Sequence, residues 1–305
     1  MARLFFRNAT KRLKCILLFM VLQCMFLSVH AVEFSLDTPW NELYKNSKSL
    51  QNRDLLVQEI VVQGEITSGD AERLLGVIKK HENLYRIVLD SPGGSMSEAL
   101  RMAEIIKFAY FDTMVKPGKI CASVCFFLFY AGSERSASPV EMMSKAAQQN
   151  WKSLQRRHST PRPMNGFVGL HRPYFKNSTG IDGQQTELMR RVSIYMEQQL
   201  IPHRLTDLMM SRPSNDIYWL TDADLMELGS YGVDLEEYFV QKCGYLKNAV
   251  QKSLELATQG RGKDGVDMIE KEEKASKCVE AVKNSLRRSA QKKILNGWKP
   301  SVNPI

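Results

Sequence analysis

A strand, a glycine turn and a helix follow one another between residues 86 and 108, and this order limits the folds open to the chain. Residues 86–90 form a β-branched, apolar run, which predicts a buried strand. Apolar residues then recur at helical spacing from Ser95 to about Phe108. Glu98, three residues after Ser95, completes a capping box that fixes the helix start. Further segments repeat this β-α order, which predicts an α/β fold.

Two segments carry groups suited to acyl-transfer chemistry. Gly93 and Gly94 lie at the strand-to-helix turn, where glycine lets backbone amides point at a developing negative charge. Ser123 lies within Cys-Ala-Ser-Val-Cys, just before an apolar run that predicts a buried helix. A hydroxyl at a helix start meets the amides and the dipole of that helix. The sequence therefore offers a nucleophile and an anion-binding turn.

A histidine follows a third predicted strand and could activate the serine. His171 comes directly after the apolar segment 167–170. A serine hydroxyl is a weak nucleophile until a base takes its proton, and the unperturbed pKa of histidine suits that task near neutral pH. Taken singly, the glycine turn, Ser123 and His171 would each be read as structural, so the interpretation depends on their order and spacing.

The stretch from about Val61 to Asp234 resembles the crotonase superfold in its serine-peptidase version, the proteolytic subunit of the Clp protease and its periplasmic relatives. The resemblance is carried by the Ser-Pro-Gly-Gly turn, by Ser123 at 31 residues beyond Pro92, and by the segment from Tyr218 to Asp234. It implies a ClpP-like α/β fold of repeated β-α units, here followed by an α-helical C-terminal extension. It also implies a serine hydrolase that cleaves peptides or proteins.

The resemblance assigns roles to four residues of this chain. Ser123 would be the nucleophile and His171 the general base, while the amides of Gly94 and Val124 would form the oxyanion hole. The interval from Ser123 to His171 is 48 residues, about twice the usual interval of the family. A polar insertion at about 136–165 accounts for the difference.

A third group is needed to hold the imidazole in the right tautomer, and a carboxylate does this best. The strict match to the family's acid falls on Ile217, so the neighbouring Asp216 is the leading candidate. A backbone carbonyl or Asp182 are the alternatives. No cofactor is expected, and no His or Cys pair has the spacing of a zinc site.

Other functional classes stay open at this point. A catalytically inactive binding or scaffold protein could keep the turn and the helix for packing alone. Crotonase-type thioester chemistry needs two amides without a serine nucleophile, but coenzyme A thioesters are cytoplasmic. A Ser-Lys dyad would need a matching lysine, and none is convincing.

Residues 1–31 predict a secretory signal peptide. Basic residues without an acid precede an apolar stretch at 15–27, and Val29-His30-Ala31 is a small-residue cleavage site. The apolar stretch is shorter than the roughly 20 residues of a spanning helix, so an uncleaved leader that anchors the chain in a membrane is the less favoured reading. We expect a periplasmic protein that begins at Val32 and carries a net charge of +4.

Three regions are predicted after the leader: a lead-in at 32–54, the ClpP-like domain at 55–240, and a basic helical extension at 241–305. The extension holds 14 basic and 7 acidic residues, but no aromatic interleaving or nucleic-acid motif accompanies them, so no nucleic acid is expected. The periplasm lacks ATP, so no ATPase partner is expected either. The superfold commonly forms trimers or stacked rings, which leaves a homo-oligomer open.

Four cysteines remain after the leader, an even number that suits an oxidising compartment. Cys243 and Cys278 flank the loop at 260–265, and we expect a disulfide that staples a helical hairpin. Cys121 and Cys125 bracket Ser123 at helical spacing, near the limit that a disulfide can bridge. Either they pair and stiffen the turn, or they are small buried thiols, and we favour the thiols.

Overall fold

The structure is a computed structural model, and it describes residues 32–37, 58–81, 83–139, 166–174, 183–245 and 249–300. The predicted signal peptide, most of the lead-in, most of the insertion at 136–165, and Asp182 lie outside the described residues. Among the helices that are described, none is long and apolar enough to cross a membrane.

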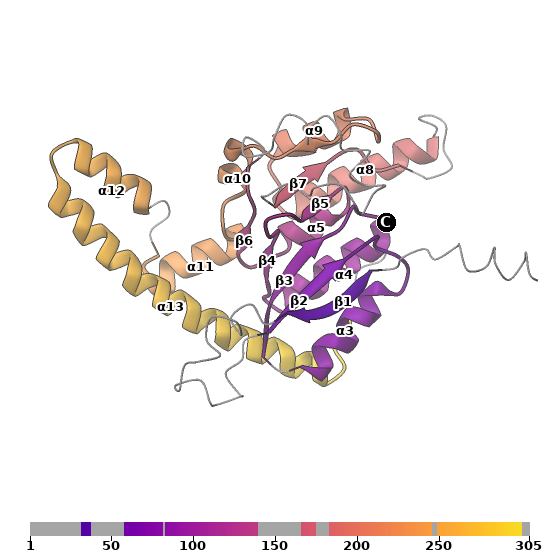
Figure 1. The fold of residues 1–305 in the computed structure, drawn as a ribbon, viewed down its shortest axis with the longest axis horizontal. Coiled ribbons are helices and arrows are strands. Elements are labelled where there is room, and N and C mark those ends of the chain that lie inside the picture. The colour runs from indigo at the N-terminus through magenta and orange to yellow at the C-terminus, as the bar shows by residue number, and fades with distance from the viewer. Residues whose placement is uncertain are drawn as a thin grey trace, which may run out of the picture. The chain divides into compact units, whose positions relative to one another are not determined.

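Two sheets form the centre of the fold (Figure 1). The larger has the order β1-β2-β3-β4-β6, with β1 antiparallel at one edge and the other strands parallel. Its strands are β1 (Glu33–Asp37), β2 (Gln58–Gln63), β3 (Leu84–Asp90), β4 (Asp112–Met114) and β6 (Arg135–Ser136). The smaller has the order β5-β7-β8, with β5 (Ile120–Ala122), β7 (Phe167–Leu170) and β8 (Tyr218–Trp219).

The first helices follow the strands that the sequence predicts. After α3 (Asp70–Lys80), α4 spans Met96–Phe108 and α5 spans Cys125–Tyr130. The Ser95 hydroxyl caps α4 by accepting the amide hydrogen of Glu98. Strand β3, the glycine turn and α4 thus confirm the predicted order, and α5 begins where the buried helix was expected. The fold is a mixed α/β fold.

These helices and strands share one apolar core. Strand residues such as Ile60 and Leu89 pack in the same buried cluster as Leu100 of α4 and Phe126 of α5. Each of these four side chains is fully buried. Burying large apolar side chains stabilises a fold by about 1.5–3 kcal/mol each, so α4 and α5 are firmly held against the strands that end at the candidate site.

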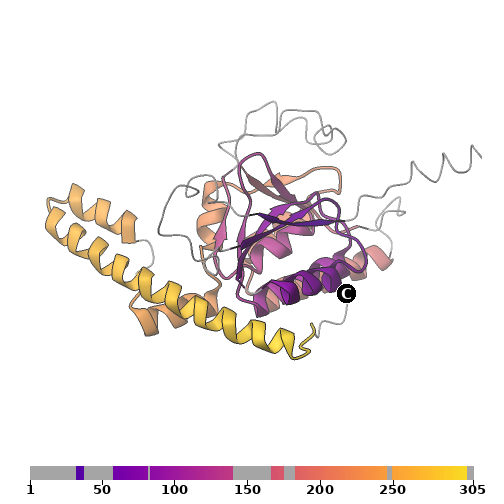
Figure 2. The same cartoon turned by 60° about the horizontal axis from the view of Figure 1, so that its bottom comes forward.

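Six helices lie in the described part of the chain from residue 183 onward. They are α8 (Gly183–Gln198), α9 (His203–Ser211), α10 (Asp222–Leu228), α11 (Val233–Cys243), α12 (Ala249–Thr258) and α13 (Gly262–Leu295). Helix α12 packs along the first part of α13, and the end of α13 packs beside α3 (Figures 1 and 2). The Cys243–Cys278 disulfide is present, and it ties α11 to α13 rather than closing the α12–α13 hairpin itself.

Candidate functional site

The carboxyl ends of three neighbouring strands meet at one edge. The amide of Ser91, just after β3, donates to the carbonyl of Ile120 (2.8 Å), and the carbonyl of Ser91 accepts from the amide of Ala122 (2.9 Å). Strand β5 then pairs in parallel with β7. Because parallel strands end on the same side of a sheet, the glycine turn, Ser123 and His171 follow these strands at a common edge.

The backbone of Ser123 is held in an unusual conformation. Its φ is 58°, in the left-handed region that residues other than glycine seldom adopt. The amide of Ser123 donates to the carbonyl of Gly169 (2.9 Å), and its carbonyl accepts from the amide of Phe126 (3.0 Å). Such residues cost of order 1–3 kcal/mol and persist only where their surroundings fix them, often at functional sites.

The glycine turn packs directly against Ser123. Gly93 has a φ of 102°, and a Cβ atom there would lie 2.7 Å from the Cβ of Ser123 and 2.9 Å from the carbonyl oxygen of Ala122. A Cβ on Gly94, where φ is 144°, would overlap the backbone of Ile66. The hydroxyl of Ser91 accepts from the amide of Gly93 (3.1 Å). Only glycine fits at these two positions.

Two backbone amides beside Ser123 are suited to bind an anion. The bridge between Ile66 and Gly94 uses the carbonyl of Gly93 and the amide of Ser95, each at 2.8 Å, so it does not use the amide of Gly94. Val124 lies at the start of α5, where the first amides have no partner within the helix. Among the backbone hydrogen bonds between described residues, none uses either amide.

His171 is buried at the end of β7, with an exposed fraction of 7%. Its Nδ1 lies 2.8 Å from the carbonyl oxygen of Arg172. A carbonyl can only accept, so Nδ1 carries the hydrogen and Nε2 is left as the basic nitrogen. Burial lowers the pKa of His171, and the bond to Arg172 opposes this in part. Burial is the larger of the two effects, so the pKa of the imidazole lies below its ordinary value.

The structure does not join Ser123 to His171 by a hydrogen bond within the described residues. Both follow strands that are paired in register, with Ala122 opposite Gly169. Ser123 and His171 therefore follow this last pair by one and by two residues, on strands that lie about 4.8 Å apart. Catalytic hydrogen bonds are often long without substrate and tighten when substrate binds.

The carboxylate of Asp216, the leading candidate for the orienting group, has another partner. Its side chain is 50% exposed, and its carboxylate pairs with the guanidinium of Arg212 (2.9 Å). No contact between Asp216 and His171 is found in the described parts of the chain. The physical reason is local, because Arg212 lies four residues away and competes for the carboxylate. The carbonyl of Arg172 holds Nδ1 instead, as one of the open alternatives allowed.

The favoured reading of Cys121 and Cys125 as free thiols is wrong. The structure joins them in a disulfide with an S–S distance of 2.03 Å. Our expectation assumed helical spacing, but Cys121 lies within strand β5 and only Cys125 is helical. The left-handed turn at Ser123 brings the two Cα atoms to 5.2 Å, within the usual disulfide range.

Among the residues that the structure describes, no group of three or more His, Cys, Asp or Glu side chains could hold a metal ion. The orienting group that the sequence reasoning ranked below Asp216 is a main-chain carbonyl. No residue type signals such a group, so only the structure could locate it at Arg172.

Comparisons with known proteins give a partial likeness only. No protein-family model matches the chain, and no curated protein matches it. Solved structures that match include ClpP1 from Listeria monocytogenes, with 14% identity and a TM-score of 0.37 over 57% of this chain and 88% of that one. A mutant of the 1510-N membrane-bound stomatin-specific protease matches with the same identity and TM-score, over 61% of this chain and 84% of that one. These values are too low to transfer residue roles to this chain.

Proposed function

We propose that this chain is a serine hydrolase that acts by acyl transfer through Ser123. The observation that carries the proposal is the backbone of Ser123, which sits in a left-handed conformation at the end of β5, between the Gly93-Gly94 turn and the start of α5. A nucleophile raised on a strand-to-helix turn beside two amides without backbone partners is the arrangement that acyl transfer needs.

The proposed reaction begins when the Oγ of Ser123 attacks a carbonyl carbon. Nε2 of His171 takes the hydroxyl proton, and the amides of Gly94 and Val124 donate to the oxyanion that forms. His171 then gives its proton to the leaving group, and an acyl-enzyme remains. Water, deprotonated by His171, then attacks the acyl-enzyme, and His171 returns this proton to the Oγ of Ser123 as the acid leaves. The carbonyl of Arg172 keeps the imidazole in the tautomer that this sequence of steps requires.

The substrate class and the setting belong to the same proposal. Peptide bonds are the proposed substrate, in keeping with the resemblance of the glycine turn and Ser123 to Clp-type peptidases. We place the protein in the periplasm, where two disulfides would form and persist. There it would act without an ATPase, alone or as a homo-oligomer.

A binding or scaffold protein is the second candidate. It is favoured by one observation, the lack of a hydrogen bond between Ser123 and His171 in the described residues. A protein that kept the turn for packing alone would have no need of an activated hydroxyl.

A fluorophosphonate probe separates the two candidates, because it reacts only with an activated serine. We expect labelling of the purified protein at Ser123, located by mass spectrometry, and loss of labelling in Ser123→Ala and His171→Ala. Asp216→Asn serves as the control and should label at the rate of the unchanged protein, because Arg172 orients the imidazole. A folded protein that does not label would support the binding protein. If Asp216→Asn lowered the labelling rate by about 10⁴-fold, the orienting role would belong to the Asp216 carboxylate.

A further inference from the structure

We infer that the Cys121–Cys125 disulfide is a positioning device for the nucleophile turn. It would hold the left-handed backbone of Ser123 and the amide of Val124 in place, and as a claim about catalysis it rests on the proposed function. Both cysteines have an exposed fraction of 0%. The disulfide therefore lies inside the fold, directly beneath the turn that presents the nucleophile.

The ring that this disulfide closes contains the nucleophile turn and nothing else. Its two ends are four residues apart, and Ala122, Ser123 and Val124 lie between them. Cys121 is the middle residue of strand β5, and Cys125 is the first residue of α5. The disulfide thus fixes how the helix leaves the strand. That junction sets both the φ of Ser123 and the direction of the Val124 amide.

The same cysteine is tied to the other half of the proposed oxyanion hole. Cys121 forms a parallel β-bridge with Ser91, whose hydroxyl accepts from the amide of Gly93. Hydrogen bonds therefore link the glycine turn to Ser91, and Ser91 to Ile120 and Ala122 on either side of Cys121, which the disulfide joins to Cys125. The two donor amides lie at the two ends of this series of links, that of Gly94 next to Gly93 and that of Val124 next to Cys125. Holding both ends fixes the distance between the donors, which an oxyanion hole requires.

A purely stabilising role predicts a different pattern. In the chain-entropy model a disulfide stabilises more when it closes a longer loop. The Cys243–Cys278 disulfide spans 35 residues, against four for Cys121–Cys125, and it lies in the C-terminal helices. It is therefore a matched control within the same chain. Removal of the longer link should cost more stability, and removal of the shorter link should cost more reactivity.

The test compares Cys121→Ala/Cys125→Ala with Cys243→Ala/Cys278→Ala in the full mature chain. We expect the first pair to label with the fluorophosphonate about 10- to 100-fold more slowly, because misplacement of a donor or nucleophile by about 1 Å has this effect. The second pair should label at the rate of the unchanged protein but melt at a lower temperature than the first. The inference would be overturned if the first pair labelled at the rate of the unchanged protein, or if both pairs lost the same fraction of the labelling rate.

Hydrogen exchange gives a readout that does not depend on activity. The amides of Phe126 and Phe127 donate to the carbonyls of Ser123 (3.0 Å) and Val124 (3.1 Å), so they report whether the turn is formed. We expect these amides to exchange about tenfold faster or more in the first pair than in the second. If the unchanged protein does not label, the proposed function fails, and the inference is then judged by this exchange alone. The inference would be overturned if the Phe126 and Phe127 amides of the first pair exchanged at the same rate as in the second pair.

A second variant covers poor folding of the alanine pair. Cys121→Ser/Cys125→Ser keeps the size of the two side chains while removing the bond. It should show the same slow labelling and fast exchange. Full reactivity in the serine pair would show that side-chain volume holds the turn, and would contradict a role for the bond.

Discussion

At the scale of single residues, the distinctive group is a buried histidine that is oriented by the main chain. Most triads place a carboxylate on Nδ1, which also stabilises the charged imidazole. In this chain Nδ1 of His171 donates to the carbonyl of Arg172, which orients the ring but carries no charge. Burial is then the larger effect, and it lowers the pKa of the imidazole. His171 should therefore remain a competent base in mildly acidic solution.

This gives a prediction for the pH dependence of labelling. A protonated imidazole cannot accept the proton of Ser123, so the rate should fall as the pH falls through the pKa of His171. Because burial lowers that pKa, we expect the half-maximal rate below pH 6.5, the ordinary value for histidine. The measurement is the fluorophosphonate rate between pH 4.5 and pH 8, in steps of about half a unit.

The exposed His203, at the start of α9, provides the control. His203→Gln should leave the profile unchanged. A midpoint clearly above 6.5 would contradict the account, because it would indicate a negative charge next to the imidazole.

At the scale of elements, the turn between β3 and α4 depends on glycine for two reasons at once. Gly93 has a positive φ, and the space where its Cβ would lie is filled by Ser123 and the carbonyl of Ala122. Gly76, in the interior of α3, has neither constraint, and a Cβ there would meet nothing within 4 Å. Substitution of Gly93 tests the packing that the candidate site requires. Substitution of Gly76 measures only the ordinary cost of a glycine within a helix.

We therefore predict opposite effects for the two alanine substitutions. Gly93→Ala should lower the free energy of unfolding by about 1–3 kcal/mol and abolish labelling of Ser123. Gly76→Ala should raise the free energy of unfolding by about 0.5–1 kcal/mol and leave the labelling of Ser123 intact, because alanine favours the helix interior. Urea denaturation measures both. A Gly93→Ala protein with normal stability and labelling would show that the turn is not packed against Ser123.

The local elements could be predicted from the sequence because their signals are local. The β-branched run, the glycine pair and the Ser95 cap all lie within about twenty residues of one another, and they are enough to place β3 and α4. The pairing of Cys121 with Cys125 was left open but not favoured, because it depends on a left-handed turn at Ser123. No pattern of residue types marks such a turn at a serine.

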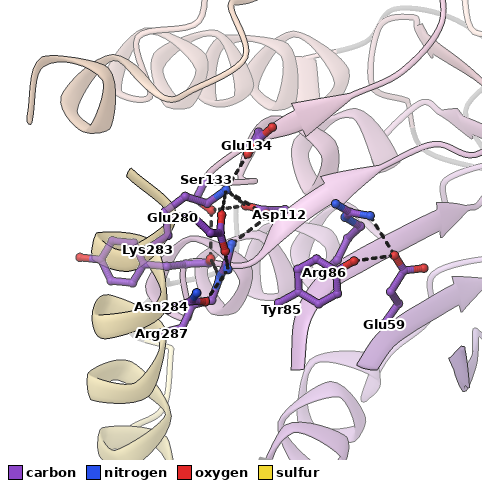
Figure 3. Close-up of polar contacts among 11 residues, drawn as sticks. Glu59, Tyr85, Arg86, Asp112, Ser133, Glu134, Glu280, Lys283, Asn284 and Arg287 are labelled. Atoms are coloured by element: carbon purple, nitrogen blue, oxygen red, sulfur yellow. Dashed lines mark hydrogen bonds and ion pairs between the residues drawn. The ribbon is translucent and has the colours of Figure 1, made fainter. Parts of the chain in front are cut away.

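At the scale of the whole molecule, a buried cluster of charges joins the C-terminal helix to the larger sheet. Lys283 of α13 has an exposed side-chain fraction of 1%, and its Nζ donates to Asp112 of β4 (3.2 Å) and to Glu134 (2.6 Å). Arg287, one turn further on, pairs with the same Asp112 (2.7 Å). Figure 3 shows both cations of α13 directed toward Asp112. Lys283 and Asp112 are 171 residues apart in the chain, so no local sequence pattern could have predicted their contact.

The cluster predicts that α13 is an integral part of the fold. Lys283→Met should lower the free energy of unfolding by about 1–3 kcal/mol, because it removes one of the two cationic partners of the buried Asp112 carboxylate and the ammonium partner of Glu134. Lys277, on the same helix, is 75% exposed and pairs with Glu273, so Lys277→Met should change the free energy by less than about 0.5 kcal/mol. Urea denaturation of both variants measures these changes in the free energy of unfolding. Equal and small effects would mean that α13 is only loosely attached.

The central claim is that Ser123 forms a covalent acyl-enzyme, and the most direct test is to observe that species. The mature protein would be mixed with p-nitrophenyl acetate and stopped with acid, and its intact mass and peptides would be measured. We predict a burst of nitrophenol and one acetyl group on Ser123, absent from Ser123→Ala and formed slowly in His171→Ala. A folded protein with no acetyl group on Ser123, or with the group on another residue, would contradict acyl transfer through this serine.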